Sequence, residues 1–199
     1  MSIKRKEVKE MPNAQNVSTG KPKVAGAIYR APLGTALPTD ANSTLNGGFV
    51  ELGYVSEDGV TNNNTPDSDS VQAWGGATVL VLQTEKPDEW TMTLIEALNP
   101  NVLKTVYGDS KVTVDSTANT ITVQATADQL ADNEYVIDMV LKGGALKRVV
   151  IPNGSLSEVG EIVYKDDDPI GYEITLAALP DTSGVTHYEY IKLGSGAST

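Results

Sequence analysis

Apolar and polar residues alternate along much of the chain, and this pattern predicts β-strands. In the segment 47–68, GGFVELGYVSEDGVTNNNTPDS, Val50, Leu52 and Tyr54 occupy every second position of the first half, as in a strand with one buried face. The second half consists mainly of Asp, Asn, Gly, Thr and Pro, which favour turns. We therefore expect a strand over 49–56 and a polar loop over 57–70, longer than most connections between strands.

The same pattern predicts strands elsewhere in the chain. They cover residues 24–30, 71–85, 89–98, 111–115, 120–125, 134–142, 146–152, 158–165, 172–179 and 187–193. Within 71–85 we interpret Gly75 and Gly76 as a bulge or a bend. A turn at 86–88 then makes 89–98 the hairpin partner of 71–85.

One helix is predicted between Asn99 and Gly108. Asn99 is a suitable N-cap, Pro100 suits the first helical position, and Gly108 suits the C-terminal stop. The apolar stripe that we expect to pack against a sheet consists of Val102, Leu103 and Val106.

The chain divides into one β-rich domain and two terminal segments. Residues 1–23 have no hydrophobic period and contain Pro12 and Gly20, which predicts a flexible basic arm. Residues 24–193 are expected to form a single domain of about ten strands. Residues 194–199, GSGAST, are expected to be a flexible tail.

The charge of the chain is acidic and unevenly distributed. The net charge is −11, yet residues 1–23 hold six Lys or Arg and only two Glu. The rest of the chain is therefore more acidic than the whole. Because affinity for nucleic acid depends on Lys and Arg at the phosphates, this composition argues against a nucleic-acid-binding protein.

Composition also limits the other functional classes. The absence of cysteine excludes disulfides, thiolate metal sites and a cysteine nucleophile. No apolar run approaches the roughly 18–20 residues that span a membrane. The charged start MSIKRKEVKE has no apolar segment behind it, so we expect no secretory signal.

Catalytic chemistry is poorly represented. The single histidine, His187, lies in THYEYIKL and has the features of an ordinary strand position. Nucleophile-elbow, zinc-protease and phosphate-loop motifs are absent from the sequence. Glu51, Glu57, Asp58 and Glu96 could pair as in a glycoside hydrolase, but solvated charge is the simpler interpretation. We predict no catalytic residue and no cofactor.

Calcium is the best metal candidate, and it fails. Asp115 begins a segment that resembles an EF-hand loop, but Thr120 stands where the motif needs Gly and Thr126 where it needs Glu. The acidic run at 166–168 is more typical of a hairpin tip. We predict no metal site.

The two tryptophans are interpreted as packing residues. A buried indole removes much apolar area from water. We expect Trp74 and Trp90 each to anchor a core or a subunit boundary, with Trp74 beside the bend at Gly75.

The order of several segments resembles a known family. GAIYRAPLGTALPTDA is followed by GGFVELGYVSEDGVT, a polar gap, VQAWGG and LNPNVLKTVYG, and later by VVIPNGSLSEVGEIVYK and IGYEITLAALPDTSG. In this order they resemble the major tail (tail tube) proteins of long-tailed, non-contractile bacteriophages, over roughly residues 24–192. The resemblance rests on the order of the segments and not on a catalytic motif.

The resemblance implies a fold and an assembly. The fold would be a β-sandwich or half-barrel flanked by one short helix, with a long inter-strand loop and extended termini. Subunits would form hexameric rings that stack into a tube through which DNA passes without specific binding. The partners would be tape measure, tail tip and tail terminator proteins, in the virion and, during assembly, in the host cytoplasm.

Two segments become candidate contact sites under this hypothesis. The polar loop would reach an adjacent ring through Glu57, Asp58, Asn62, Asn63, Asn64 and Asp67. The basic arm would contact a neighbouring subunit through Lys4, Arg5 and Lys6. The alternatives are an extracellular β-sandwich that binds a surface or a carbohydrate, and a small hydrolase on a β-scaffold.

Overall fold

Strands make up most of the regular structure. The computed structural model describes residues 14–24 and 27–194. Its strands are β1 (Lys21–Pro22), β2 (Ile28–Pro32), β3 (Val50–Glu51), β4 (Val55–Asn63), β5 (Asp67–Gln72), β6 (Thr78–Glu85), β7 (Glu89–Leu94), β8 (Val112–Asp115), β9 (Thr120–Val123), β10 (Asn133–Val140), β11 (Leu146–Val159), β12 (Tyr172–Ala178) and β13 (Tyr188–Lys192). The helices are α1 (Pro100–Tyr107) and the short 3₁₀ segments η1 (Ala14–Asn16), η2 (Asp109–Lys111) and η3 (Lys142–Gly144). The predicted β class with one α-helix is confirmed.

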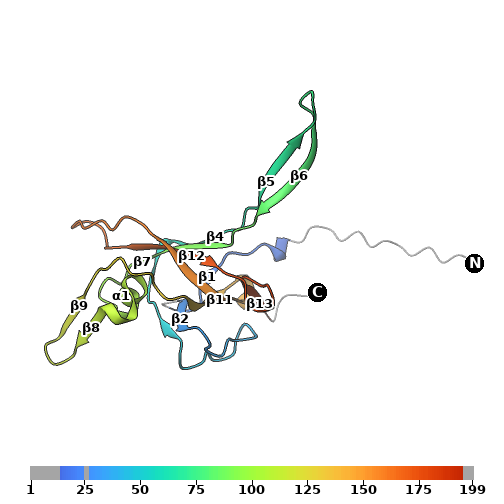
Figure 1. Ribbon diagram of the computed structural model, residues 1–199. Helices are drawn as coiled ribbons and strands as arrows, with labels where there is room; N and C mark the ends of the chain where they lie inside the picture. Colours follow the sequence, from blue (N-terminus) through green and yellow to red (C-terminus); the bar gives the residue numbers. More distant parts are fainter. Residues whose placement is uncertain (1–13, 25–26, 195–199) are drawn as a thin grey trace, which may run out of the picture.

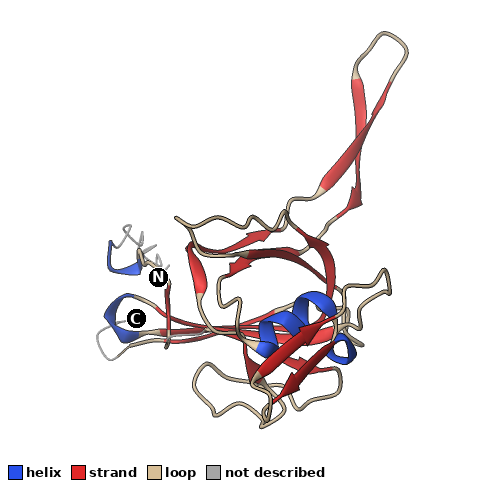
Figure 2. Ribbon diagram, turned by 90° about the vertical axis from the view of Figure 1, so that its left-hand side faces the viewer, coloured by secondary structure: helices blue, strands red, loops and turns tan. Residues whose placement is uncertain are grey.

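Most strands belong to one antiparallel sheet that folds into an open sandwich (Figures 1 and 2). Its order is β3-β2-β10-β11-β12-β7-β4, with β1 also paired to β10 and β13 to β11. The long strand β11 pairs with β10 and β13 in its first part and with β12 in its second part. Two further hairpins, β5–β6 and β8–β9, lie outside this sheet.

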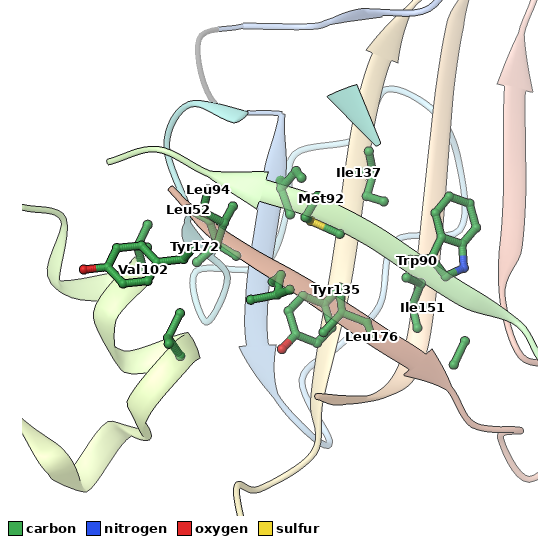
Figure 3. Close-up of a cluster of buried hydrophobic side chains, with 14 of the residues drawn as sticks. Leu52, Trp90, Met92, Leu94, Val102, Tyr135, Ile137, Ile151, Tyr172 and Leu176 are labelled. Atoms are coloured by element: carbon green, nitrogen blue, oxygen red, sulfur yellow. The ribbon is translucent and has the colours of Figure 1, made fainter. Parts of the chain in front are cut away.

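Alternating burial explains why these segments form strands. In β7 and β12 every second side chain is buried, which is the period of a strand with one apolar face. The register places the buried residues of the two strands opposite one another, as Trp90↔Leu176, Met92↔Ile174 and Leu94↔Tyr172. These residues form the centre of the core (Figure 3).

Helix α1 has the ends that the sequence predicts. The Asn99 side chain accepts a hydrogen bond from the backbone N of Asn101 at 2.9 Å, and Gly108 follows the last turn with a φ of 100°. Thr105 is buried between turns and donates to the carbonyl of Asn101. The buried apolar side chains of the helix are Val102, Leu103 and Val106.

The long link 35–48 is held to the sheet by one buried arginine. Arg148 on β11 lies opposite Asp138 on β10, and its Nε contacts Asp138 Oδ1 at 2.6 Å. Its Nη1 donates to the carbonyls of Asp40 and Ser43, both at 3.1 Å. These hydrogen bonds hold residues 35–48 against the sheet, although this segment contains no strand.

The polar segment 57–70 is not an irregular loop, and this prediction is wrong. Residues 55–63 form β4, which pairs with β7, and residues 67–72 form β5, which pairs with β6. The predicted strand 71–85 is also wrong, because Gly75 and Gly76, with φ of 111° and 88°, form the turn of the β5–β6 hairpin. Consequently 89–98 does not pair with 71–85; β7 lies between β4 and β12.

Other strand boundaries also differ from the predictions; β7, for example, ends at Leu94 and not at residue 98. The strand at 24–30 begins at Ile28 and ends at Pro32. The strand at 49–56 is interrupted at Gly53, whose φ is 73° and whose missing side chain leaves room for the carboxylate of Glu96. The strand at 158–165 is instead the end of β11, which stops at Val159 opposite Ile174 of β12.

Candidate functional site

The β5–β6 hairpin is the most prominent feature outside the sandwich. It extends away from the body, as Figures 1 and 2 both show. Every residue of both strands is exposed, including the apolar run at 79–82. An apolar run with this exposure is unusual in a monomer, because large exposed apolar patches mark interaction surfaces.

Trp74 lies in the turn of this hairpin and is fully exposed. The prediction that it anchors the core is wrong. Its alternative role at a subunit boundary stays a prediction. Trp90, by contrast, is buried in the core with 5% exposure, as predicted.

The six residues predicted for the inter-ring loop lie along the approach to this hairpin. Glu57 and Asp58 occupy a bulge of β4, where the register jumps from Val55↔Leu94 to Val60↔Met92. Asn62 and Asn63 end β4, Asn64 follows it, and Asp67 begins β5 opposite Glu85. These residues are therefore spread along β4, the link after it and the start of β5, and they do not form one cluster.

Asn62 and Asn63 fasten the base of the hairpin to the sandwich. The Nδ2 of Asn62 donates to Asp88 Oδ1 at 2.7 Å and to the carbonyl of Glu89 at 3.1 Å. The Nδ2 of Asn63 donates to Glu89 Oε2 at 3.4 Å, and Thr65 donates to Asn63 Oδ1 at 2.9 Å. These hydrogen bonds attach the base of the hairpin to the sandwich.

Asp88 is the centre of that base. It is 4% exposed, and besides Asn62 it accepts a hydrogen bond from the Thr186 hydroxyl at 2.6 Å and faces the Nδ1 of His187. Burial by itself raises the pKa of Asp88, but hydrogen bonds from Thr186, His187 and Asn62 outweigh it and hold the pKa below its ordinary value of 3.8. The ionised carboxylate therefore joins the hairpin base to the segment before β13.

His187 lies directly before β13 and not within a strand as predicted. Its ring contacts Trp90 edge-on, with 5.2 Å between ring centroids, and its Nδ1 faces Asp88. Sequence analysis missed Asp88, which it assigned to a turn, and missed the bonding role of Asn62. No local signal could reveal this cluster, because its partners lie 26 to 99 residues apart in the sequence.

The acidic residues that were considered and rejected as metal ligands have simple structural contacts. Asp115 Oδ1 accepts hydrogen bonds from the backbone of Thr117 and Ala118, so it closes the β8–β9 turn. Asp168 forms an exposed ion pair with Lys165 at 2.8 Å. Within residues 14–24 and 27–194, no group of three or more His, Cys, Asp or Glu side chains could hold a metal ion.

Two remaining observations concern the rest of the chain. Lys4, Arg5 and Lys6 of the predicted arm lie outside the described residues. Among the residues that are described, no helix has the length and apolar character needed to cross a membrane.

The comparisons with known proteins address the family of this fold. A family model described as phage tail tube protein matches residues 13–196. The chain belongs to this family. A comparison with curated proteins gives no match. The match includes the sandwich, both projecting hairpins and α1, so the resemblance inferred from the sequence is confirmed.

Membership of the family gives the general role of this tail tube protein. It is a structural component of the phage tail, which assembles with other tail proteins and forms oligomers. The family points to a non-enzymatic role.

Proposed function

We propose that this tail tube protein closes into hexameric rings and that the rings stack into a hollow tube for DNA ejection into the host. The observation that carries the proposal is the exposed β5–β6 hairpin with its apolar side chains. An isolated two-stranded hairpin is only marginally stable in water. A neighbouring subunit that covers the hairpin would stabilise it. The number six comes from the resemblance to tail tube proteins.

In this proposal the path from β4 to β5 is the inter-ring element. Glu57, Asp58, Asn62, Asn63, Asn64 and Asp67 shape its approach and base. The domain division follows the same scheme: a sandwich over 24–193 forms the ring, with an arm over 1–23 and a tail over 194–199 available to neighbours. The helix residues Val102, Leu103 and Val106 act inside the subunit, since their side chains are buried.

The acidic charge supports the role of the tube as a passage for DNA. With a net charge of −11, the subunit repels phosphates on average. DNA that passes through a ring of such subunits meets few cations to displace its counterions. The lumen would then guide DNA without specific binding.

The basic arm suits contact with a neighbouring acidic subunit. Lys4, Arg5 and Lys6 form the densest run of positive charge in the chain, and exposed ion pairs are weakened by salt. The arm would therefore contribute a salt-sensitive contact. Tape measure, tail tip and tail terminator proteins complete the tail, which assembles in the host cytoplasm.

Electron microscopy of the purified, concentrated protein tests the proposal. Hollow tubes or stacked rings of uniform diameter with sixfold symmetry are expected, at low salt more than at high salt. Rings of another symmetry would contradict the hexamer. Protein that forms neither rings nor tubes at any concentration or salt would contradict self-assembly.

A further inference from the structure

The β5–β6 hairpin has one predominantly apolar face. The register pairs Val71 with Leu80 and Asp69 with Leu82, so Val71, Leu80 and Leu82 share a face. These three side chains are 45%, 49% and 50% exposed. The opposite face pairs Ser70 with Val81 and Ser68 with Gln83, and Val79 shares it with Val81 by alternation; these two valines are 62% and 61% exposed among Ser and Gln side chains. The hairpin therefore presents an apolar side and a mostly polar side to its surroundings.

The β8–β9 hairpin has a second exposed apolar face. Its register pairs Val112 with Val123 and Val114 with Ile121, which places these four residues on one side. Val112 is buried at the base, whereas Val114 is 49% exposed and Ile121 and Val123 are each 36% exposed. The other side consists of the pairs Thr113↔Thr122 and Asp115↔Thr120.

These two apolar faces lie far apart in the molecule. Figure 1 shows the β5–β6 and β8–β9 hairpins extending from opposite sides of the sandwich. The two faces of one subunit therefore do not cover each other. A contact that repeats along a stack requires two different surfaces on opposite sides of the subunit, and this chain has such a pair.

We propose that the apolar face of the β5–β6 hairpin packs on the apolar face of the β8–β9 hairpin of another copy of this chain. The occupant of each face is thus the other hairpin of a second subunit. This inference rests on the proposed stacking of rings and adds the surface that receives the hairpin. In this contact, the face of β5–β6 with Ser68 and Ser70 and the face of β8–β9 with Thr113 and Thr122 point away from the interface.

The chemistry of the two faces is compatible with this contact. Two sheet faces pack with side chains interdigitated at about 10 Å between backbones. Asp69, with Asp67 two residues before it, lies on the β5–β6 face of Val71, Leu80 and Leu82, and Asp115 lies on the opposite, Thr side of β8–β9. The contact therefore does not bring the β5 carboxylates against Asp115. The exposed Val163 and Tyr164 lie outside any strand and provide no such ordered face.

Disulfide trapping tests the pairing directly, because the chain has no cysteine of its own. Subunits carrying Leu80→Cys are mixed with subunits carrying Ile121→Cys, assembled, and treated with an oxidant that removes the two thiol hydrogens. A dimer on a non-reducing gel is expected. Thr122→Cys, on the opposite face of β9, and Tyr164→Cys serve as controls that should not give this dimer. A dimer with either control but not with Ile121→Cys would overturn the inference.

A matched pair of substitutions separates this inference from the proposed function. Ile121→Lys should abolish stacking and leave single rings, whereas Thr122→Lys should leave tubes intact, with thermal melting checked for both. If wild-type protein forms tubes and Ile121→Lys forms them equally well, the inference fails and the tube function stands. If wild-type protein forms neither rings nor tubes, the proposed function fails and the inference fails with it.

Discussion

At the scale of single residues, the polar groups that hold the structure together are buried and reach distant parts of the chain. Arg148 and Asp138 are 1% and 3% exposed, and Asp88 is 4% exposed. Arg148 fastens the link 35–48, whereas Asp88 fastens the base of the β5–β6 hairpin. Each therefore positions a segment that apolar packing alone would not fix.

Removal of Arg148 should strongly destabilise the subunit. Arg148→Met leaves Asp138 as a buried carboxylate whose remaining ionic partner is Lys23 at 3.5 Å. Breaking one side of a buried pair typically costs about 3–5 kcal/mol, and we expect a loss of that size in urea unfolding. Lys147→Met, which removes the partly exposed pair with Glu189, should cost less than about 1 kcal/mol. Equal effects of the two substitutions would contradict the assigned role of Arg148.

Asp88 should make part of the stability dependent on acid pH. Its folded-state pKa lies below the ordinary value of 3.8, so its contribution is present above about pH 4 and is lost as pH falls through the folded-state pKa. Asp88→Asn should therefore cost about 1–3 kcal/mol at pH 7 and less near pH 3. Urea unfolding of both proteins at the two pH values measures this. A cost that does not shrink at low pH would contradict it.

At the scale of elements, the parts with a clear pattern were predictable. Alternation located β7 and β12, and the Asn99 cap with Gly108 located α1. These elements bury one face within their own subunit. Their pattern therefore shows which side chains face the core of the same subunit and which face solvent.

The strands β4 and β5 could not be predicted, because their sequences lack such a pattern. β5 has the sequence DSDSVQ and β4 ends in Asn62 and Asn63, so neither segment has an apolar face of its own. β4 becomes a strand because it pairs with β7, and β5 because it pairs with β6. Such pairings are tertiary, and they override the local preference of Asp, Asn and Ser for turns.

Replacing the β5–β6 hairpin should separate folding from assembly. Asn63 pairs with Glu89, so residues 65–87 can be replaced by Gly-Gly to connect β4 to β7 through a short turn. Because the hairpin is exposed on both faces, its loss removes little buried surface. We expect a melting temperature within a few degrees of the wild type and no tubes in electron microscopy. Unfolding of this variant would show that the hairpin supports its own subunit.

At the scale of the whole molecule, the described residues combine one buried core with two exposed apolar surfaces. The sandwich buries its apolar residues in one cluster, whereas β5–β6 and β8–β9 expose theirs on opposite sides (Figure 1). Exposed hairpins of this kind are an aggregation hazard for a free monomer. In the proposed assembly the same surfaces would form the contacts between subunits, and the acidic charge would keep free subunits apart until those contacts form.

The same charge predicts how assembled tubes treat DNA. Subunits with a net charge of −11 provide few cations to release counterions from the duplex, and this release is the main source of non-specific affinity. We expect no measurable binding of a labelled duplex to tubes at about 0.1 M salt in fluorescence anisotropy. Dissociation constants of about 10⁻⁴–10⁻⁶ M, the usual range for non-specific binders, would contradict this prediction.

If binding did occur, a variant without residues 1–20 would show whether the basic arm causes it, because Lys4, Arg5 and Lys6 are its densest positive run. Binding that survived the truncation would place the attraction in the acidic body and would remove the electrostatic argument for a passage in which DNA slides.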